Sequence, residues 1–220
     1  MYIVEFVGLP GSGKTTMCKR YEWNLKKRQK IATNVQVQAL IFSGIKRRLF
    51  LLRVFLYPKS IKIMSLARKH VPNYKSSEAK AWLKRIQQII FLLDCYERQK
   101  LEYALMDEGF VQFVTSICHG EEISDSMMEF AQKVFEMAYK GRECKFLYVD
   151  VDKNEAMERI KKRNRPGDRF LADSDEEVLE KLRVKEGNLL KCLELLKEYD
   201  VRTIKPTGEE KIQELLSMIE

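Results

Sequence analysis

The stretch GLPGSGKTT, residues 8–16, constrains the fold of this chain more than any other feature. The short run MYIVEFVG before it is β-branched and aromatic, which is typical of a buried parallel strand. The residues after it, KTTMCKRYEWNLKKR, have helical composition and contain no helix breaker. A strand that runs through a glycine-rich turn directly into a helix predicts the opening unit of an α/β sheet protein.

The same stretch carries the residue types that hold the phosphates of a nucleotide. Its glycines let successive backbone N–H groups converge on phosphate oxygens at the positive end of the following helix. The spacing predicts that Lys14 reaches the β- and γ-phosphates and that Thr15 offers its hydroxyl to Mg²⁺. We therefore predict ATP and Mg²⁺ as cofactors, bound by Gly8, Pro10, Gly11, Ser12, Gly13, Lys14, Thr15 and Thr16. The alternative is a glycine-rich turn that merely joins a strand to a helix.

Composition favours one large domain over residues 1–220, since 45% of the residues are apolar and can form a core. The five cysteines are scattered, odd in number and never paired as CxxC, which argues against a disulfide framework or a zinc knuckle. No apolar run reaches about 18 residues, the length of a membrane span. We expect a soluble chain in the reducing cytoplasm, in which His70 and His119 are structural or surface residues.

Further strands alternate with helices along the chain, which predicts a parallel sheet covered on both faces. The strand-like runs KIATNVQVQ, YALMDEG, CKFLYVDVD and VRTI begin at residues 30, 103, 144 and 201. Helices are expected over 125–141, from Lys153, over 175–199 and from about Gly208.

The net charge of +8 comes from one helix-rich insert at about residues 43–100, in which residues 46–100 hold 14 Lys or Arg and 3 Asp or Glu. Breaks are expected near Pro58 and in HVPNYKSS. In the first helix, Ile45, Leu49, Leu52 and Leu56 fall at helical spacing, which favours a helix that packs them in the core. Contact with a membrane surface or a polyanion, or attraction of an anionic acceptor, are alternative uses of the charge. No specific nucleic-acid motif is present.

Two carboxylates follow the strand YALM, and they are compatible with either phosphoryl transfer to an acceptor or hydrolysis of ATP. Asp107 is assigned to Mg²⁺ through water, or to taking the proton of an acceptor hydroxyl. Glu108 could instead activate water, in an ATPase that uses this pair of residues as a Walker B motif. A GTPase switch is not favoured, because we find no guanine-reading Asn-Lys-x-Asp sequence.

Four arginines follow the strand CKFLYVDVD. Arg159 and Arg163 lie four residues apart and so share a helix face, and Arg165 and Arg169 follow on a loop with Pro and Gly. We interpret residues 159–172 as a lid that closes over the triphosphate and neutralises the charge that moves between donor and acceptor. Such a lid favours a kinase over an ATPase, because closure excludes water. The alternatives are a solvated basic helix and, for the whole chain, a nucleotide-dependent binding module.

With these motifs, the sequence resembles the nucleotide-kinase branch of the P-loop phosphotransferases, and thymidylate-kinase-like proteins most of all. The resemblance rests on GLPGSGKTT, MDEG, YVDVD with RIKKRNRPGDRF, and the terminal VRTIKPTGEE. It implies a three-layer fold with a five-stranded parallel sheet in the order 2-3-1-4-5, and an acceptor bound between the insert and the MDEG strand. It also implies that the loop after the last strand, with Pro206 and Thr207, contacts the adenine.

One position departs from this resemblance. Such kinases carry an arginine after the acidic residue, where it holds acceptor or phosphate oxygens, whereas this chain has Glu108. A carboxylate repels a phosphate monoester, so a nucleoside, a sugar or another hydroxyl-bearing metabolite is as strong a candidate as a nucleotide. Trp82, Tyr74 and Phe110 could flank it. The sequence predicts an ATP-dependent small-molecule kinase and leaves open its acceptor and whether it forms a homodimer.

Overall fold

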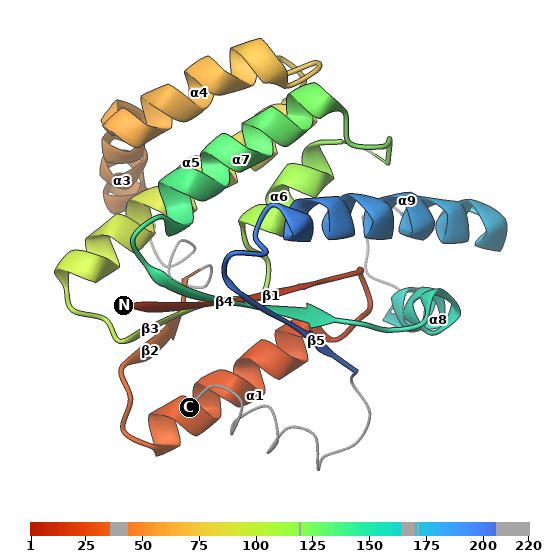
Figure 1. The fold of residues 1–220 in the computed structure, drawn as a ribbon. Coiled ribbons are helices and arrows are strands. Elements are labelled where there is room, and N and C mark those ends of the chain that lie inside the picture. The colour runs from red at the N-terminus through yellow and green to blue at the C-terminus, as the bar shows by residue number, and fades with distance from the viewer. Residues whose placement is uncertain (36–43, 119, 164–169, 171, 206–220) are drawn as a thin grey trace.

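The computed structural model describes residues 1–35, 44–118, 120–163, 170 and 172–205. In this part of the chain, one five-stranded sheet lies at the centre of the molecule, and every pair of neighbouring strands is parallel (Figure 1). The strands are β1 (Tyr2–Gly8), β2 (Ala32–Asn34), β3 (Tyr103–Met106), β4 (Glu143–Val149) and β5 (Asp200–Ile204). Their order, β2-β3-β1-β4-β5, confirms the predicted fold class.

Helices cover both faces of the sheet (Figure 1). Helix α1 (Lys14–Lys27) lies on one face, and α8 (Lys153–Arg163) lies near the end of the sheet to which β4 leads. The opposite face carries the remaining helices: α3 (Gly44–Leu56), α4 (Pro58–His70), α5 (Ser77–Arg98), α6 (Phe110–Ile117), α7 (Asp125–Tyr139) and α9 (Asp175–Glu194). The predicted strand at 30–38 is shorter than expected, with β2 ending at Asn34 and residues 36–38 outside the described part. The helix predicted from Gly208 also lies outside it.

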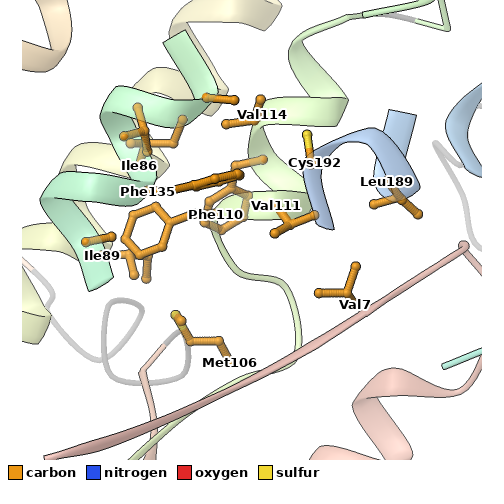
Figure 2. Close-up of a cluster of buried hydrophobic side chains, with 14 of the residues drawn as sticks. Val7, Ile86, Ile89, Met106, Phe110, Val111, Val114, Phe135, Leu189 and Cys192 are labelled. Carbon is orange, nitrogen blue, oxygen red and sulfur yellow. The ribbon is translucent and has the colours of Figure 1, made fainter. Parts of the chain in front are cut away.

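Alternation along the strands divides the core in two. In β1, Val4 and Phe6 face α1, whereas Ile3 and Val7 face the larger cluster formed with the helices of the opposite face. Figure 2 shows Val7 and Met106 extending from the sheet on the side where α6 places Phe110 and other apolar residues. Each fully buried large apolar side chain contributes roughly 1.5–3 kcal/mol, so these two clusters account for much of the stability of the fold.

Glu5 interrupts the apolar alternation of β1 on the face of the larger cluster. Its side chain is fully buried, and its carboxylate accepts hydrogen bonds from the backbone N–H of Val111, at 3.0 Å, and from the hydroxyl of Tyr139. Gly109 makes this approach possible, because a Cβ atom at that position would collide with the carboxylate. Glu5 therefore joins β1 to the start of α6 and to the end of α7.

Helix α6 was not predicted from the sequence. Its residues, FVQFVTSI, are apolar, β-branched and aromatic, which is typical of strands. All eight of its residues are buried. A helix that is buried on every side shows no amphipathic period, so helical spacing could not identify it. Tertiary packing, with the Glu5 carboxylate at its first turn, determines its structure instead.

The prediction for the first helix of the insert was wrong about which side chains it buries. Leu49, Leu52 and Leu56 are 53%, 54% and 61% exposed, and Phe50 and Val54 are the side chains that α3 packs into the core. The side chain of Ile45 lies outside the described part. The helix is apolar on more than one side, so spacing alone could not decide which stripe faces inward. Among the described helices, none combines the length and the apolar character needed to cross a membrane.

Burial of Glu5 makes the stability of the fold depend on pH. Burial raises the pKa of this carboxyl to about 7, although its hydrogen bonds oppose the rise. Its ordinary pKa is 4.5. Between these values the folded chain keeps a proton that the unfolded chain releases, so stability must fall as the pH rises through this window, by about 3 kcal/mol in total.

We expect Glu5→Gln to remove this dependence, because the amide is neutral at every pH and can still accept from Val111 and donate to Tyr139. Urea unfolding of the wild-type protein and of this variant, between pH 4.5 and about pH 7, measures how the free energy of unfolding changes with pH. Glu198→Gln, which changes an exposed carboxylate, is the matched control and should keep it. If Glu5→Gln shows the same pH dependence of stability as the wild-type protein, Glu5 is not the group that causes it.

Candidate active site

The glycine-rich loop lies between β1 and α1, at the carboxyl end of the central strand (Figure 1). The Lys14 ammonium donates hydrogen bonds to the backbone oxygens of Gly8, at 2.8 Å, and Leu9, at 2.7 Å, and lies 3.4 Å from the Ser12 hydroxyl. Thr15 and Thr16 are exposed in the first turn of α1, which contains no acidic residue. The positive end of this helix therefore faces outward with hydroxyls beside it, an arrangement suited to an anion.

Charged groups of both signs gather around Lys14. Burial lowers the pKa of its ammonium to about 7; the carboxylates of Glu108 and Asp107 favour the charged form, and Lys185 and Arg163 oppose it. These four residues come from the end of β3, from α9 and from the end of α8. The structure thus brings Lys14, Asp107 and Arg163, which the sequence assigned to one site, into electrostatic range of one another.

Asp107 follows β3 and is only 8% exposed. The side-chain amide of Asn34, at the end of the neighbouring strand β2, donates to one of its oxygens at 3.2 Å. This hydrogen bond orients the Asp107 carboxylate. It also joins β2 and β3 at their carboxyl ends, the side of the sheet on which open α/β folds bind ligands. Asn34 was not identified from the sequence, in which it lies in the middle of the strand predicted over residues 30–38.

The donors near the loop are compatible with Mg²⁺ held jointly with phosphate oxygens. Asp107 provides a carboxylate just after β3, which pairs with β1, and Thr15 provides a hydroxyl in the first turn of α1. Within the described ranges, no group of three or more His, Cys, Asp or Glu side chains is placed to hold a metal ion by itself. Mg²⁺ commonly binds through one or two carboxylates together with substrate phosphates, so this donor set suits it.

A second group of side chains lies beside Glu108. The guanidinium of Arg85, on α5, is 3.7 Å from the Glu108 carboxylate and 5.2 Å from the centre of the Trp82 ring. Trp82 in turn lies 5.9 Å from the ring of Phe113. Phe110, by contrast, is fully buried and packs edge-on against Tyr139, so it belongs to the core and does not flank a ligand. Arg85 was not identified from the sequence.

Helix α8 is packed directly against the glycine-rich loop. Gly11 has φ = +82°, and a Cβ atom there would lie 2.5 Å from the backbone oxygen of Ala156. Arg159 donates to the backbone oxygen of Gly11, at 3.4 Å, and also pairs with Glu155. Arg159 therefore contacts the loop from within α8, whereas Arg163 is exposed at the end of the helix. Arg165, Arg169, Pro206 and Thr207 lie outside the described residues.

Lys185 is a charged residue near the site that sequence reasoning missed. It lies within α9, is half-buried and donates to the Ser116 hydroxyl at 3.1 Å. Its sequence neighbours KEGNLLK suggest only a solvated helix, because nothing in their spacing shows that this lysine faces Lys14. The packing of α9 against α6 and β1 brings it there.

Comparison with known proteins gives a likeness of fold. No protein-family profile matches the sequence. A deoxyadenosine kinase from M. mycoides, solved with the products dCMP and a flexible dCDP bound, aligns over 100% of this chain and 98% of its own, with a TM-score of 0.51 and 14% identity. A second structure of that enzyme, with bound dATP, aligns over the same shares at 14% identity with a TM-score of 0.49. At this identity the likeness shows that the two proteins share a fold.

The contact between Gly11 and α8 leads to a prediction about stability. We expect Gly11→Ala to destabilise the fold by about 2–4 kcal/mol, because it combines an unfavourable φ with a collision against a backbone oxygen. Gly13→Ala is the matched control, since its φ of +93° is equally unfavourable but its Cβ would meet nothing within 4 Å. It should cost only about 1–2 kcal/mol. Equal costs in denaturant unfolding would show that α8 does not press on the loop.

Proposed function

We propose that this chain is an ATP-dependent kinase that transfers the γ-phosphoryl group to a hydroxyl of a nucleoside or a similar small molecule. The observation that supports this most is the convergence on Lys14 of two carboxylates and two further cations, from β3, α8 and α9. The group lies at the carboxyl ends of parallel strands, the edge where open α/β sheets bind ligands. The shared fold of a deoxyadenosine kinase is consistent with the proposal.

The phosphate side of the site would be formed by the glycine-rich loop and its cations. Lys14 would leave the backbone oxygens of Gly8 and Leu9 to contact phosphate oxygens, and the anion would favour its charged form. Mg²⁺, held by Thr15, Asp107 and the phosphates, would neutralise charge on the β- and γ-phosphates. Arg163 and Lys185 would add positive charge around the transferred group, where it is most effective in the transition state.

The acceptor side would be formed by Trp82, Arg85 and Glu108. The Trp82 ring, with Arg85 over it, suits a flat and partly apolar group such as a nucleobase. Glu108 can accept a hydrogen bond from a hydroxyl of the acceptor. Its carboxylate would repel a phosphate monoester, because both groups are anionic. Asp107 and Glu108 both remain candidates for the group that takes the hydroxyl proton, and both lie near Lys14. These chemical preferences favour a nucleoside over a nucleoside monophosphate.

Hydrolysis of ATP is the competing function, with Glu108 activating water. Rates with and without acceptor separate the two functions.

We expect a nucleoside to raise ADP release from Mg·ATP at least about tenfold above the rate without acceptor, because an oriented hydroxyl replaces water as the nucleophile. Nucleoside monophosphates should give no such increase. Lys14→Ala should lower the stimulated rate by about 10²-fold or more, because the phosphates lose a preorganised cation. Lys19→Ala, which removes an exposed charge from the same helix, should leave it unchanged.

Two results of this assay would contradict the proposal. Rapid ADP release that no acceptor increases would assign the chain to the ATPases. Stimulation by nucleoside monophosphates and not by nucleosides would mean that Glu108 does not select the acceptor.

Arg163 and Lys185 should act mainly on the rate of transfer. We expect Arg163→Ala to lower the single-turnover rate by about 10³-fold, within the range known for arginines that contact the transferred phosphoryl group. Lys185→Met keeps most of the packing and should lower the rate by about tenfold. The affinity for ATP, measured separately by calorimetry, should change much less, since an interaction specific to the transition state affects rate more than binding.

Arg183→Ala is the matched control, because Arg183 is an exposed cation on the same helix as Lys185, paired only with Glu180 among the described residues. Wild-type rates in both test variants would assign Arg163 and Lys185 to solvated or purely structural roles.

A further inference from the structure

The outer side of α3 and the start of α4 leave large apolar side chains exposed to solvent. Among the described residues, eight large apolar side chains are exposed, and five of them lie on α3 and the start of α4. They are Leu49, Leu52, Phe55, Leu56 and Ile61, each more than 50% exposed. We call these residues, with the basic residues described next, the α3–α4 surface. A concentration of exposed apolar side chains on one helix pair marks an interaction surface, whereas scattered ones need no explanation.

Basic side chains border these apolar residues. Arg48 lies one helical turn from Leu52, and Arg53 lies one turn from both Leu49 and Leu56. Arg47 and Lys62 are also exposed, and none of these four cations forms an ion pair with another described residue. Residues 44–77 contain nine Lys or Arg and no Asp or Glu. The segment that forms the α3–α4 surface therefore contributes basic side chains and no acidic ones.

The corner that presents this surface is firmly attached to the body of the protein. Phe50 and Val54 are buried, and the rings of Phe50 and Tyr57 pack edge-on against Phe91 of α5. Where α4 begins, Lys59 forms a 2.8 Å ion pair with Asp94, and the Tyr57 hydroxyl also donates to Asp94. The exposed stripe thus belongs to a helix that the core already holds in place.

We propose that the α3–α4 surface binds the interface of an anionic lipid membrane. Leucine and phenylalanine side chains enter the boundary between headgroups and acyl chains, while arginine and lysine stay with the phosphate headgroups. The surface provides both groups on adjacent turns. The attraction to an anionic leaflet increases with each basic residue close to it, and no acidic residue in this segment opposes it.

Two other occupants agree less well with these residues. A second copy of the chain packed symmetrically on this surface would bring arginines against arginines, which costs binding energy. Nucleic acid would use the cations but would leave the leucines and Ile61 in water, because its bases stack on aromatic rings and not on aliphatic side chains.

The location of the surface allows membrane contact without obstructing the candidate active site. In Figure 1, α3 lies on the side of the molecule opposite α8, which packs on the glycine-rich loop. The proposal does not depend on the proposed kinase function, because it rests on α3 and α4 alone. None of the residues changed below belongs to the candidate site.

Vesicle flotation with the full chain tests the proposal, using phosphatidylcholine vesicles with or without about one third phosphatidylglycerol. We expect the wild-type protein to float with the anionic vesicles at least about tenfold more than with the neutral ones. Leu52→Gln with Phe55→Gln should reduce flotation at least about fivefold, and Arg48→Gln with Arg53→Gln should do the same. Leu190→Gln and Arg183→Gln change exposed residues of the same kinds on α9, and they should have no effect.

Three outcomes would overturn the proposal. The first is equal recovery of the wild-type protein with both kinds of vesicle, or with neither. The second is loss of binding in the arginine variant alone, which would indicate a general polyanion site, and binding of an oligonucleotide would identify it. The third is a concentration-dependent dimer, measured by light scattering, that the Leu52 and Phe55 variant abolishes. Circular dichroism and unfolding of each variant check that it is folded.

Discussion

The carboxylate of Glu5 is the contact on which the candidate site most depends. A buried carboxyl without partners would be costly, and the hydrogen bonds from Val111 and Tyr139 offset that cost. They also fix the turn that contains Gly109 against the central strand. Because Asp107 and Glu108 lie immediately before that turn, the positions of two carboxylates that favour the charged form of Lys14 depend on a contact on the buried side of β1.

The site has two sides that differ in charge. Lys14, Arg163 and Lys185 supply positive charge on one side, whereas Asp107 and Glu108 supply negative charge, and Glu108 also pairs with Arg85 of α5. A polyanion beside the cations and an uncharged hydroxyl compound beside the carboxylates would be complementary to these two sides. The opposing influences on Lys14 reflect this division, because the same ammonium lies within range of carboxylates and of other cations.

Local patterns in the sequence predicted most of the strands, whereas their order was implied by the resemblance to nucleotide kinases. The strand, glycine turn and helix at residues 2–27 form a continuous unit, so their structure and the place of Lys14 followed directly. Asn34, Arg85 and Lys185 could not be predicted in the same way, because each reaches the site through a contact with a distant segment. The apolar face of α3 was wrongly predicted for a related reason: the helix has apolar residues on two sides, and only its packing on α5 shows which side is buried.

Helix α6 also has a consequence for the unfolded chain. Its sequence, FVQFVTSI, has high β-propensity, no charge and no proline, which are the properties of segments that form cross-β aggregates. In the folded protein all eight residues are buried, so the segment is protected from other chains. Before Glu5 and Gly109 come together during folding, the same segment is free to pair as a strand with a second chain. The contact between Glu5 and the start of α6, which positions the residues of the candidate site, therefore also keeps this aggregation-prone segment in a helix.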